Sequence, residues 1–218
     1  MEFDKRKLNT IERGKNKASY DKKIIYSILD ASEICHIAFV FDDTAFVQPI
    51  NFGRIGDQLY IHGSHLNRMT SALIESKTVC LNVTILDALK LTRSAFHHSV
   101  NYRSAMVFGS VEEVLEPQKK IKALKGIINH FVPNRWAHCR PPSDAELKAT
   151  RVLEISIDFA SSKIANTPPK DNKDDLKLDF WAGTIPVKKT LMPPIPDQFM
   201  AHNTEVPKHI LEFIENYT

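Results

Sequence analysis

The stretch LTRSAFHHSVNYRSAMVFG, residues 91–109, carries the clearest fold signal in the chain. It has a short basic start and a paired histidine, and its Asn-Tyr-Arg-Ser segment enters a strand that ends near Gly109. Successive side chains of a strand point to opposite faces of the sheet, so Tyr102 and Ser104 share one face and Arg103 takes the other. An arginine in this position can bind a phosphate, pair with a carboxylate or cross a subunit interface, and the residues leave these alternatives open.

A second stretch, LYIHGSHLNRMTSAL at residues 59–73, predicts a strand, a polar turn and a helix with Arg68 in its first turn. A cation there opposes the helix dipole, whereas a bound anion would reverse that cost. Ser64, Asn67 and Thr70 offer donors nearby. The alternative is a surface arginine that points into solvent. Together the two stretches suggest a phosphate-bearing, aromatic-faced ligand on a β scaffold.

The hydrophobic pattern along the rest of the chain indicates short strands with helices inserted at a few places. Period-two alternation predicts strands at 36–41, 45–52, 58–62, 78–85, 101–115 and 152–159. Helical spacing and capping residues predict helices at 19–32, 68–76, 118–130, 143–150 and 205–217. This order does not alternate strand and helix, so we expect a mainly β protein with added helices, built as an antiparallel barrel or sandwich.

Composition limits the class of protein. The chain has 218 residues, 43% hydrophobic and 25% charged, with a net charge of +3, which is ordinary for a globular domain and argues against a dedicated nucleic-acid binder. Three widely spaced cysteines without a CxxC pair favour a reducing compartment. No apolar run reaches membrane-span length and no signal peptide is recognisable, so we expect a cytoplasmic protein without a membrane partner.

Three regions are expected along the chain. Residues 1–18 form a basic N-terminal arm, interpreted as solvated and partly disordered. Residues 19–165 form the β domain. Residues 166–218 form a proline-bearing C-terminal extension that packs on the barrel or on a dimer partner.

Familiar catalytic motifs are missing from the sequence. It contains no GxGxxG, no GxxxxGK[ST] and no GxSxG, so Rossmann, P-loop and serine-hydrolase interpretations lack support. His97 and His98 are adjacent, and in a strand they would point to opposite faces, so the pair alone does not make a metal site. No catalytic residue is assigned.

Several segments, in the same order and at similar spacing, resemble the pyridoxamine 5′-phosphate oxidase-like family, in its flavin-nucleotide-binding branch related to nitroimidazole resistance. The resemblance covers roughly residues 13–187. It rests on RGKNKASYDKKIIYSILD, ICHIAFV, FGRIGDQLYIHGSHLNRM, LKLTRSAFHHSVNYRSAMVFG, ELKATRVLEISID, SSKI and WAGTIPV. It implies a six-stranded antiparallel split β-barrel, the FMN-binding split barrel, which forms a homodimer with FMN at the interface.

The resemblance also implies a set of cofactor-binding residues. The strand-turn-helix element that holds the flavin phosphate maps onto His62, Gly63, Ser64, Asn67, Arg68 and Met69. Many relatives carry glycine and lysine where this chain has Asn67 and Met69, so Arg68 must supply the cation. The other side of the cofactor would be bordered by Pro49, Asn51, Asn101, Tyr102, Arg103 and Ser104.

The leading hypothesis from this resemblance is an FMN-dependent oxidoreductase of unknown substrate, because the flavin brings its own reactivity and needs no protein nucleophile. The alternative is a non-catalytic flavin or haem binder, in which His97 or His98 would be an axial ligand. A third interpretation, a basic-arm nucleic-acid binder, is disfavoured because the strongly basic part is only a terminus.

Overall fold

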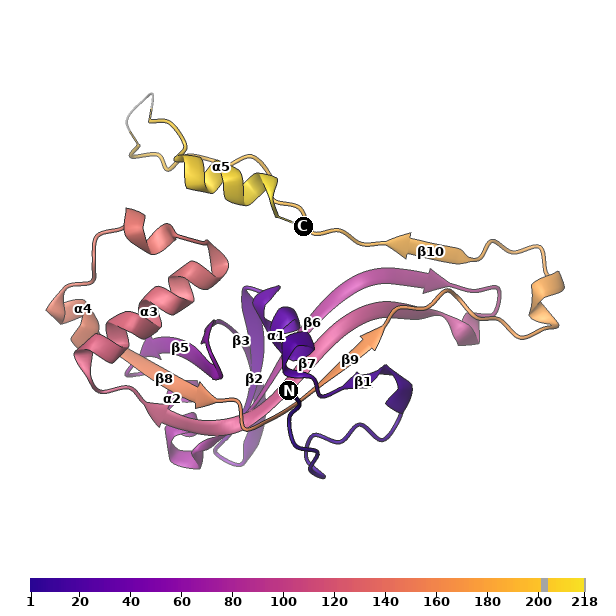
Figure 1. Cartoon of the computed structure of the whole chain (residues 1–218), viewed down its shortest axis with the longest axis horizontal. Helices are drawn as coiled ribbons and strands as arrows, with labels where there is room; N and C mark the ends of the chain where they lie inside the picture. The colour runs from indigo at the N-terminus through magenta and orange to yellow at the C-terminus, as the bar shows by residue number, and fades with distance from the viewer. Residues whose placement is uncertain (201–203, 218) are drawn as a thin grey trace.

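The structure is a computed structural model that describes residues 1–200 and 204–217. It is built on one antiparallel sheet that curls into an open barrel, with helices at one end and a long arm projecting at the other (Figure 1). The sheet has ten strands in the described part of the chain, and its main path runs β3-β2-β6-β7-β8-β5-β4. β9 adds to β7, β1 to β9, and β10 to β6. The mainly β, antiparallel split-barrel prediction is confirmed, with short strands and the extension enlarging the expected six-stranded sheet.

The strands have the following bounds: β1 (Ala18–Ser19), β2 (Ile34–Phe41), β3 (Thr44–Asn51), β4 (Gly53–Ile55), β5 (Gln58–Ser64), β6 (Thr78–Leu91), β7 (Ser99–Glu113), β8 (Thr150–Ser156), β9 (Phe159–Ala165) and β10 (Gly183–Pro186). The helices are α1 (Lys22–Asp30), α2 (Arg68–Ser76), α3 (Pro117–Phe131), α4 (Asp144–Ala149) and α5 (Lys208–Glu215). Short 3-10 turns are η1 (Lys15–Lys17), η2 (Ala95–His97), η3 (Arg135–His138) and η4 (Asp175–Lys177).

The barrel interior is filled by the inward face of the sheet. Ile37, Leu81 and Val107 are fully buried there, on neighbouring strands in register. Apolar faces of α1 and α2 close this core, and α3 packs on β5 and β8 to form a second, smaller cluster. Burial of these stripes accounts for the period-two and helical patterns in the sequence.

Local capping explains where the helices begin. Asp21 accepts from two amides at the start of α1, and Ser143 with Glu146 forms the expected capping box of α4. Pro117 occupies the first turn of α3, where its missing N–H costs nothing. No helix in the described residues is long and apolar enough to cross a membrane.

At Gly109, β7 changes the strand with which it pairs on one side. β7 pairs with β6 along its length, with β9 up to Phe108, and with β8 from Val111 onward. A Cβ atom at Gly109 would lie 1.7 Å from the Ser156 carbonyl oxygen, an impossible contact. Glycine is therefore required where the backbones cross, at the point where the sequence suggests a bend.

The structure corrects one predicted strand. Residues 152–159 do not form a single strand, because the chain leaves β8 after Ser156 and starts β9 at Phe159. At the break the Asp158 carboxylate accepts from the Ser110 amide, and the Asp158 amide donates to the Phe108 carbonyl. The alternation in the sequence hid this corner, since Phe159 continues the apolar series of Ile155 and Ile157, whereas in the structure the core-facing residue of β9 is Ala160.

The N-terminal arm is also different from the expectation of a solvated terminus. Phe3 is buried in the main core, and Asn9 is 2% exposed. The Asn9 amide donates to the carbonyls of Asp4 and Ala160. The N-terminal segment therefore packs on the domain through these two side chains.

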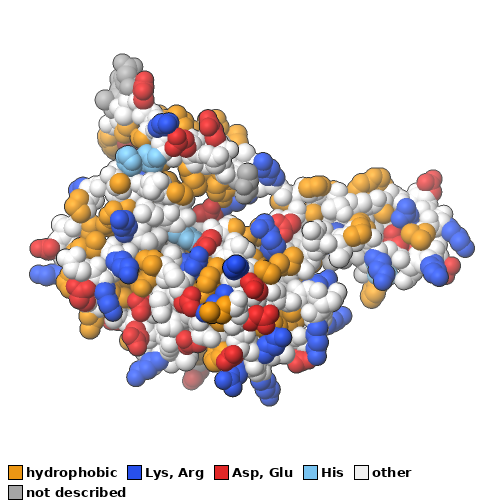
Figure 2. Space-filling view, in the orientation of Figure 1, with side chains coloured by type: hydrophobic (Ala, Val, Ile, Leu, Met, Phe, Trp, Pro, Cys, Tyr) orange, Lys and Arg blue, Asp and Glu red, His pale blue; other side chains and the backbone are white. Residues whose placement is uncertain are grey.

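The C-terminal extension runs back along the arm of the molecule, whose backbone is the β6–β7 hairpin (Figure 1). β10 pairs with β6, and α5 lies beside η3, where the rings of His138 and His209 stack at 3.8 Å between centroids. Figure 2 shows hydrophobic side chains exposed along this arm. Trp181 is 67% exposed, so it does not anchor the extension in the core.

Candidate functional site

The turn between β5 and α2 is built by the helix cap. The Asn67 side chain accepts from the amides of Met69 and Thr70 at 2.9 and 3.3 Å. The Met69 side chain is fully buried in the main core. Two of the residues assigned to the cofactor from sequence therefore hold the start of α2 in place.

Arg68 is exposed at this helix start. Its guanidinium carbon lies over the rings of Phe46 and Phe41, 4.4 and 5.4 Å from their centroids. No carboxylate among the described residues forms an ion pair with it. Nearby, the exposed Ser64 hydroxyl oxygen accepts from the Leu66 amide, which leaves its hydrogen available to donate. An oriented, unpaired cation beside a helix N-terminus suits an anion.

A second cation, not anticipated from the sequence, stands beside the same helix. Arg151 on β8 lies opposite Gly63 of β5, and its guanidinium donates to the Ser71 hydroxyl at 2.9 Å. Its Nε lies 3.5 Å from a Glu113 carboxylate oxygen. Only strand register brings Arg151 here, so no local motif could have indicated it.

The outward face of the sheet carries four more of the predicted residues: Pro49, Asn51, Tyr102 and Ser104. Register places them with Ile34, His36, Ala38, Val40, Ala45, Val47, Thr78, Cys80, Asn82, Thr84, Leu86, Met106, Phe108 and Ser110. We call these eighteen positions of β2, β3, β6 and β7 the uncharged sheet face, because none is Lys, Arg, Asp or Glu. Beyond them, on β9, the same face carries Lys163 opposite Ser104. Val40 and Val47 are 64% and 69% exposed there. A solvated antiparallel face normally carries charged residues, so this one is suited to being covered.

The two other predicted residues of β7, Asn101 and Arg103, form hydrogen bonds within the chain. Asn101 is 6% exposed, and its side-chain amide exchanges two hydrogen bonds with the Thr167 backbone, at 3.1 and 3.2 Å. Arg103 forms a fork with Asp87, at 2.8 and 3.0 Å. Asn101 thus holds the extension on the arm. Of the three roles that the sequence left open for Arg103, the structure shows pairing with a carboxylate, on the face opposite Tyr102 and Ser104.

His62 lies on the other side of β5, away from the barrel interior. It lines a cavity of about 360 Å³ together with Leu124, Ile127, Ile128, Trp136, Cys139, Arg140, Pro142 and Glu146. Its Nδ1 is buried and has no hydrogen-bond partner. Burial lowers the pKa of His62, so the ring is neutral at neutral pH. A neutral imidazole with a free nitrogen is the commonest metal ligand in proteins.

The rim of this cavity contains an ion pair and a thiol. Arg140 holds both carboxylate oxygens of Glu146, and together with the Ser143 amide it lowers the pKa of that carboxyl to about 2. Cys139 is exposed. No cluster of three metal-ligating side chains exists among the described residues, so a metal bound at His62 would have to bring most of its own ligands.

The paired histidines lie elsewhere. They sit at the tip of the arm, His97 in η2 and His98 just after it. His98 Nδ1 is 3.1 Å from the Ser94 carbonyl oxygen, and the His97 ring meets Phe96 edge-on at 5.2 Å between centroids. The local turn therefore accounts for His98 without a ligand.

An antiparallel barrel left open on one side, with a helix starting directly after a barrel strand, defines the split-barrel class of β proteins. A model of the pyridoxamine 5′-phosphate oxidase family matches residues 21–164, and the chain belongs to this family. A search of curated protein sequences found no match.

Solved structures extend the likeness over almost the whole chain. The flavocytochrome Anf3 from Azotobacter vinelandii is 33% identical, with 95% of this chain and 96% of that chain covered and a TM-score of 0.88. The FAD- and haem-binding protein from Mycobacterium smegmatis is 32% identical, with 91% and 97% covered and a TM-score of 0.86. A candidate 5-nitroimidazole antibiotic resistance protein from Bacteroides thetaiotaomicron is 25% identical, with 67% and 86% covered and a TM-score of 0.58.

Proposed function

We propose that this protein is an FMN-dependent oxidoreductase that holds the flavin phosphate at the start of α2. The observation that carries the proposal is Arg68, an exposed guanidinium that two aromatic rings orient and that no carboxylate of the described residues pairs with. A flavin phosphate supplies the missing negative charge, and the Ser64 hydroxyl is placed to donate to it. Family membership and the flavin named in the similar structures support the same class of ligand.

The bound flavin would supply hydride and electron transfer. The chain's own part is to bind and orient: Arg68 and Ser64 fix the phosphate, while Asn67 and buried Met69 keep the helix start rigid. The three free cysteines support a reducing, cytoplasmic setting for this chemistry.

We further propose a homodimer in which the uncharged sheet face meets the same face of a second copy. Two-fold interfaces use one self-complementary patch, and a face without like charges can meet itself without repulsion. The predicted site residues Pro49, Asn51, Tyr102 and Ser104 lie on this face. The flavin ring would be enclosed where the two faces meet.

Replacing the cation tests the phosphate site. In the variant Arg68→Ala, FMN affinity should fall by about 1.5–3 kcal/mol, the usual cost of losing a hydrogen bond to a charged group. Fluorescence titration of the apoprotein with FMN and, separately, FAD measures this. The control is Arg13→Ala, an exposed arginine without an ion pair. Unchanged FMN affinity in Arg68→Ala would remove the assignment.

A second candidate function is haem binding, and His62 is the observation that favours it. A porphyrin brings four nitrogen ligands, so one neutral histidine in an apolar cavity suffices to hold the iron. His62, a neutral imidazole that lines this cavity, fits this need, whereas His97 and His98 lie at the arm tip. The two structures similar over nearly the full chain are named as a flavocytochrome and an FAD- and haem-binding protein. Titration of the apoprotein with haem, followed by the Soret band, tests the candidate; a spectrum identical to free haem would refute it.

A further inference from the structure

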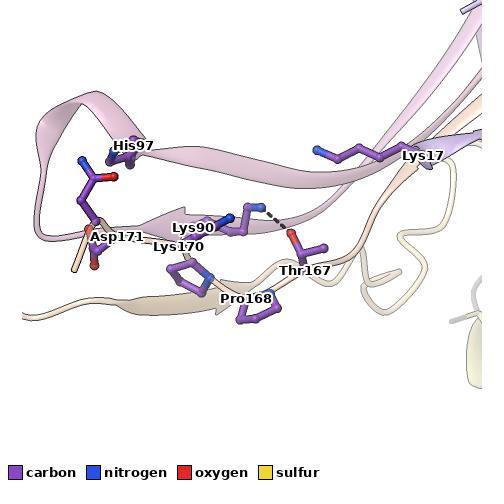
Figure 3. A pocket seen from close by; sticks show the side chains of 9 residues that line it. Lys17, Lys90, His97, Thr167, Pro168, Lys170 and Asp171 are labelled. Carbon is purple, nitrogen blue, oxygen red and sulfur yellow. Dashed lines mark hydrogen bonds between the residues drawn. The ribbon is translucent and has the colours of Figure 1, made fainter. Parts of the chain in front are cut away.

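A cavity of about 440 Å³ lies on the arm, in a different part of the molecule from α2 and β5, which carry Arg68 and His62 (Figure 1). It is lined by Lys17, Lys90, His97, Thr167, Pro168, Pro169, Lys170, Asp171 and Asn172. Figure 3 shows the lysines entering from separate segments: Lys17 from the N-terminal region, Lys90 from β6 and Lys170 from the extension.

Lys90 is the unusual residue of this cavity. It is only 7% exposed, and among the described residues its ammonium group donates to the Thr167 hydroxyl alone, at 3.0 Å. Burial lowers the pKa of Lys90, and Lys17 lowers it further. Lysine is almost never this buried unless paired, because an uncompensated buried charge is costly.

The cavity's acidic residue does not supply the missing charge. Asp171 is bound to Arg93, with one oxygen 3.1 Å from the guanidinium and the other 3.0 Å from the Arg93 amide. These two charges cancel each other. Lys17, Lys90 and Lys170 form no ion pair among the described residues. The cavity therefore has an excess of three positive charges.

We infer that this arm cavity is a binding site for a phosphate-bearing small molecule, with Lys90 as its buried anchor. Three ammonium groups from three segments can converge on one polyanion, and each charge-assisted hydrogen bond would be strengthened by the partial exclusion of water. Asn172 and Thr167 offer further donors to phosphate oxygens. The site is separate from the flavin phosphate at Arg68, so this inference stands independently of the proposed function.

Inorganic pyrophosphate is a suitable probe, titrated by calorimetry into the protein loaded with saturating FMN, which fills the Arg68 site. The wild type should bind, and Lys90→Met should weaken binding about tenfold or more, the equivalent of one lost charge-assisted contact. Lys170→Ala, at an exposed residue, should weaken it too without disturbing the fold. The control Lys23→Met, at an exposed lysine on α1, should leave it unchanged.

Thermal unfolding separates a ligand site from a purely structural lysine. At one pyrophosphate concentration the melting temperature should rise more for the wild type than for Lys90→Met, since stabilisation by a ligand falls as its affinity falls. No binding to the wild type, or equal affinity in wild type, Lys90→Met and Lys170→Ala, would overturn the inference.

Discussion

His62 has surroundings that folding alone does not explain. Its Nδ1 is buried without a partner, and an unsatisfied buried polar atom costs about 1–3 kcal/mol. The same ring lines a mostly apolar cavity, which places the imidazole where a ligand can meet it. Arg68 is a parallel case at the other site, a cation that the chain orients and leaves unpaired.

Removing the His62 ring should abolish axial ligation if haem binds in this cavity. In His62→Ala the Soret band of the ligated complex should be lost, and free imidazole added to the variant should restore it, because the alanine leaves room for an exogenous ligand. His97→Ala serves as the control and should keep the wild-type spectrum. The reverse pattern, in which only His97→Ala loses the Soret band, would identify His97 at the arm tip as the axial ligand.

Strand geometry decides which face of the sheet a side chain takes, and this could be predicted from the sequence. The alternation predicted that Tyr102 and Ser104 share a face opposite Arg103, and the register confirms it. It could not predict that Asn101 holds Thr167 or that Arg151 reaches Ser71, because both contacts join residues distant in the chain. The sequence also could not predict that the His62 Nδ1 atom lacks a hydrogen-bond partner, because this depends on which residues of α3 and η3 surround the ring.

Among the elements, the end of the C-terminal extension contacts an acidic residue near β2. Glu33, just before β2, receives hydrogen bonds from Lys189 and from the Tyr217 hydroxyl. Burial alone raises the pKa of Glu33, but these hydrogen bonds outweigh it, so the pKa lies below its ordinary value of 4.5. The charged carboxylate therefore holds the end of the chain near β2.

Protonation of Glu33 should release this contact. Because the folded-state pKa is lowered, the stabilisation is present above about pH 4.5 and is lost as the pH falls through the folded value. Glu33→Gln should imitate the acidic state at pH 7, raising the hydrogen-exchange rate of α5 amides about fivefold, as for a partly exposed ion pair. Glu215→Gln, on α5 itself, is the control. Unaltered exchange in Glu33→Gln would show that other contacts hold α5.

Most elements were predictable because their caps and periods are local. α2 has the predicted bounds of residues 68–76, and α4 has its capping box. The break between β8 and β9 was missed because Phe159 continues the sequence alternation of Ile155 and Ile157, although in β9 it is Ala160 that joins the core. The tip of the arm was missed too, since η2 is a single turn held by Ser94.

For the whole molecule, the uncharged sheet face is the feature on which the proposed homodimer rests. A charge placed there should block pairing of two copies, because burying it without a counter-charge is costly. Val47→Glu should therefore shift the protein from dimer to monomer in sedimentation experiments, and it should release FMN as well. Leu115→Glu, which charges an exposed aliphatic residue away from this face, should leave the dimer intact. A dimeric Val47→Glu variant with full FMN content would contradict the proposed interface.

The central claim, that this split barrel carries FMN, is tested most directly by the absorbance spectrum of the protein purified without added cofactor. Mass spectrometry of the compound released by heat then identifies the ligand. The account predicts flavin absorbance and FMN close to one per chain. A colourless protein that also fails to bind added FMN would contradict it.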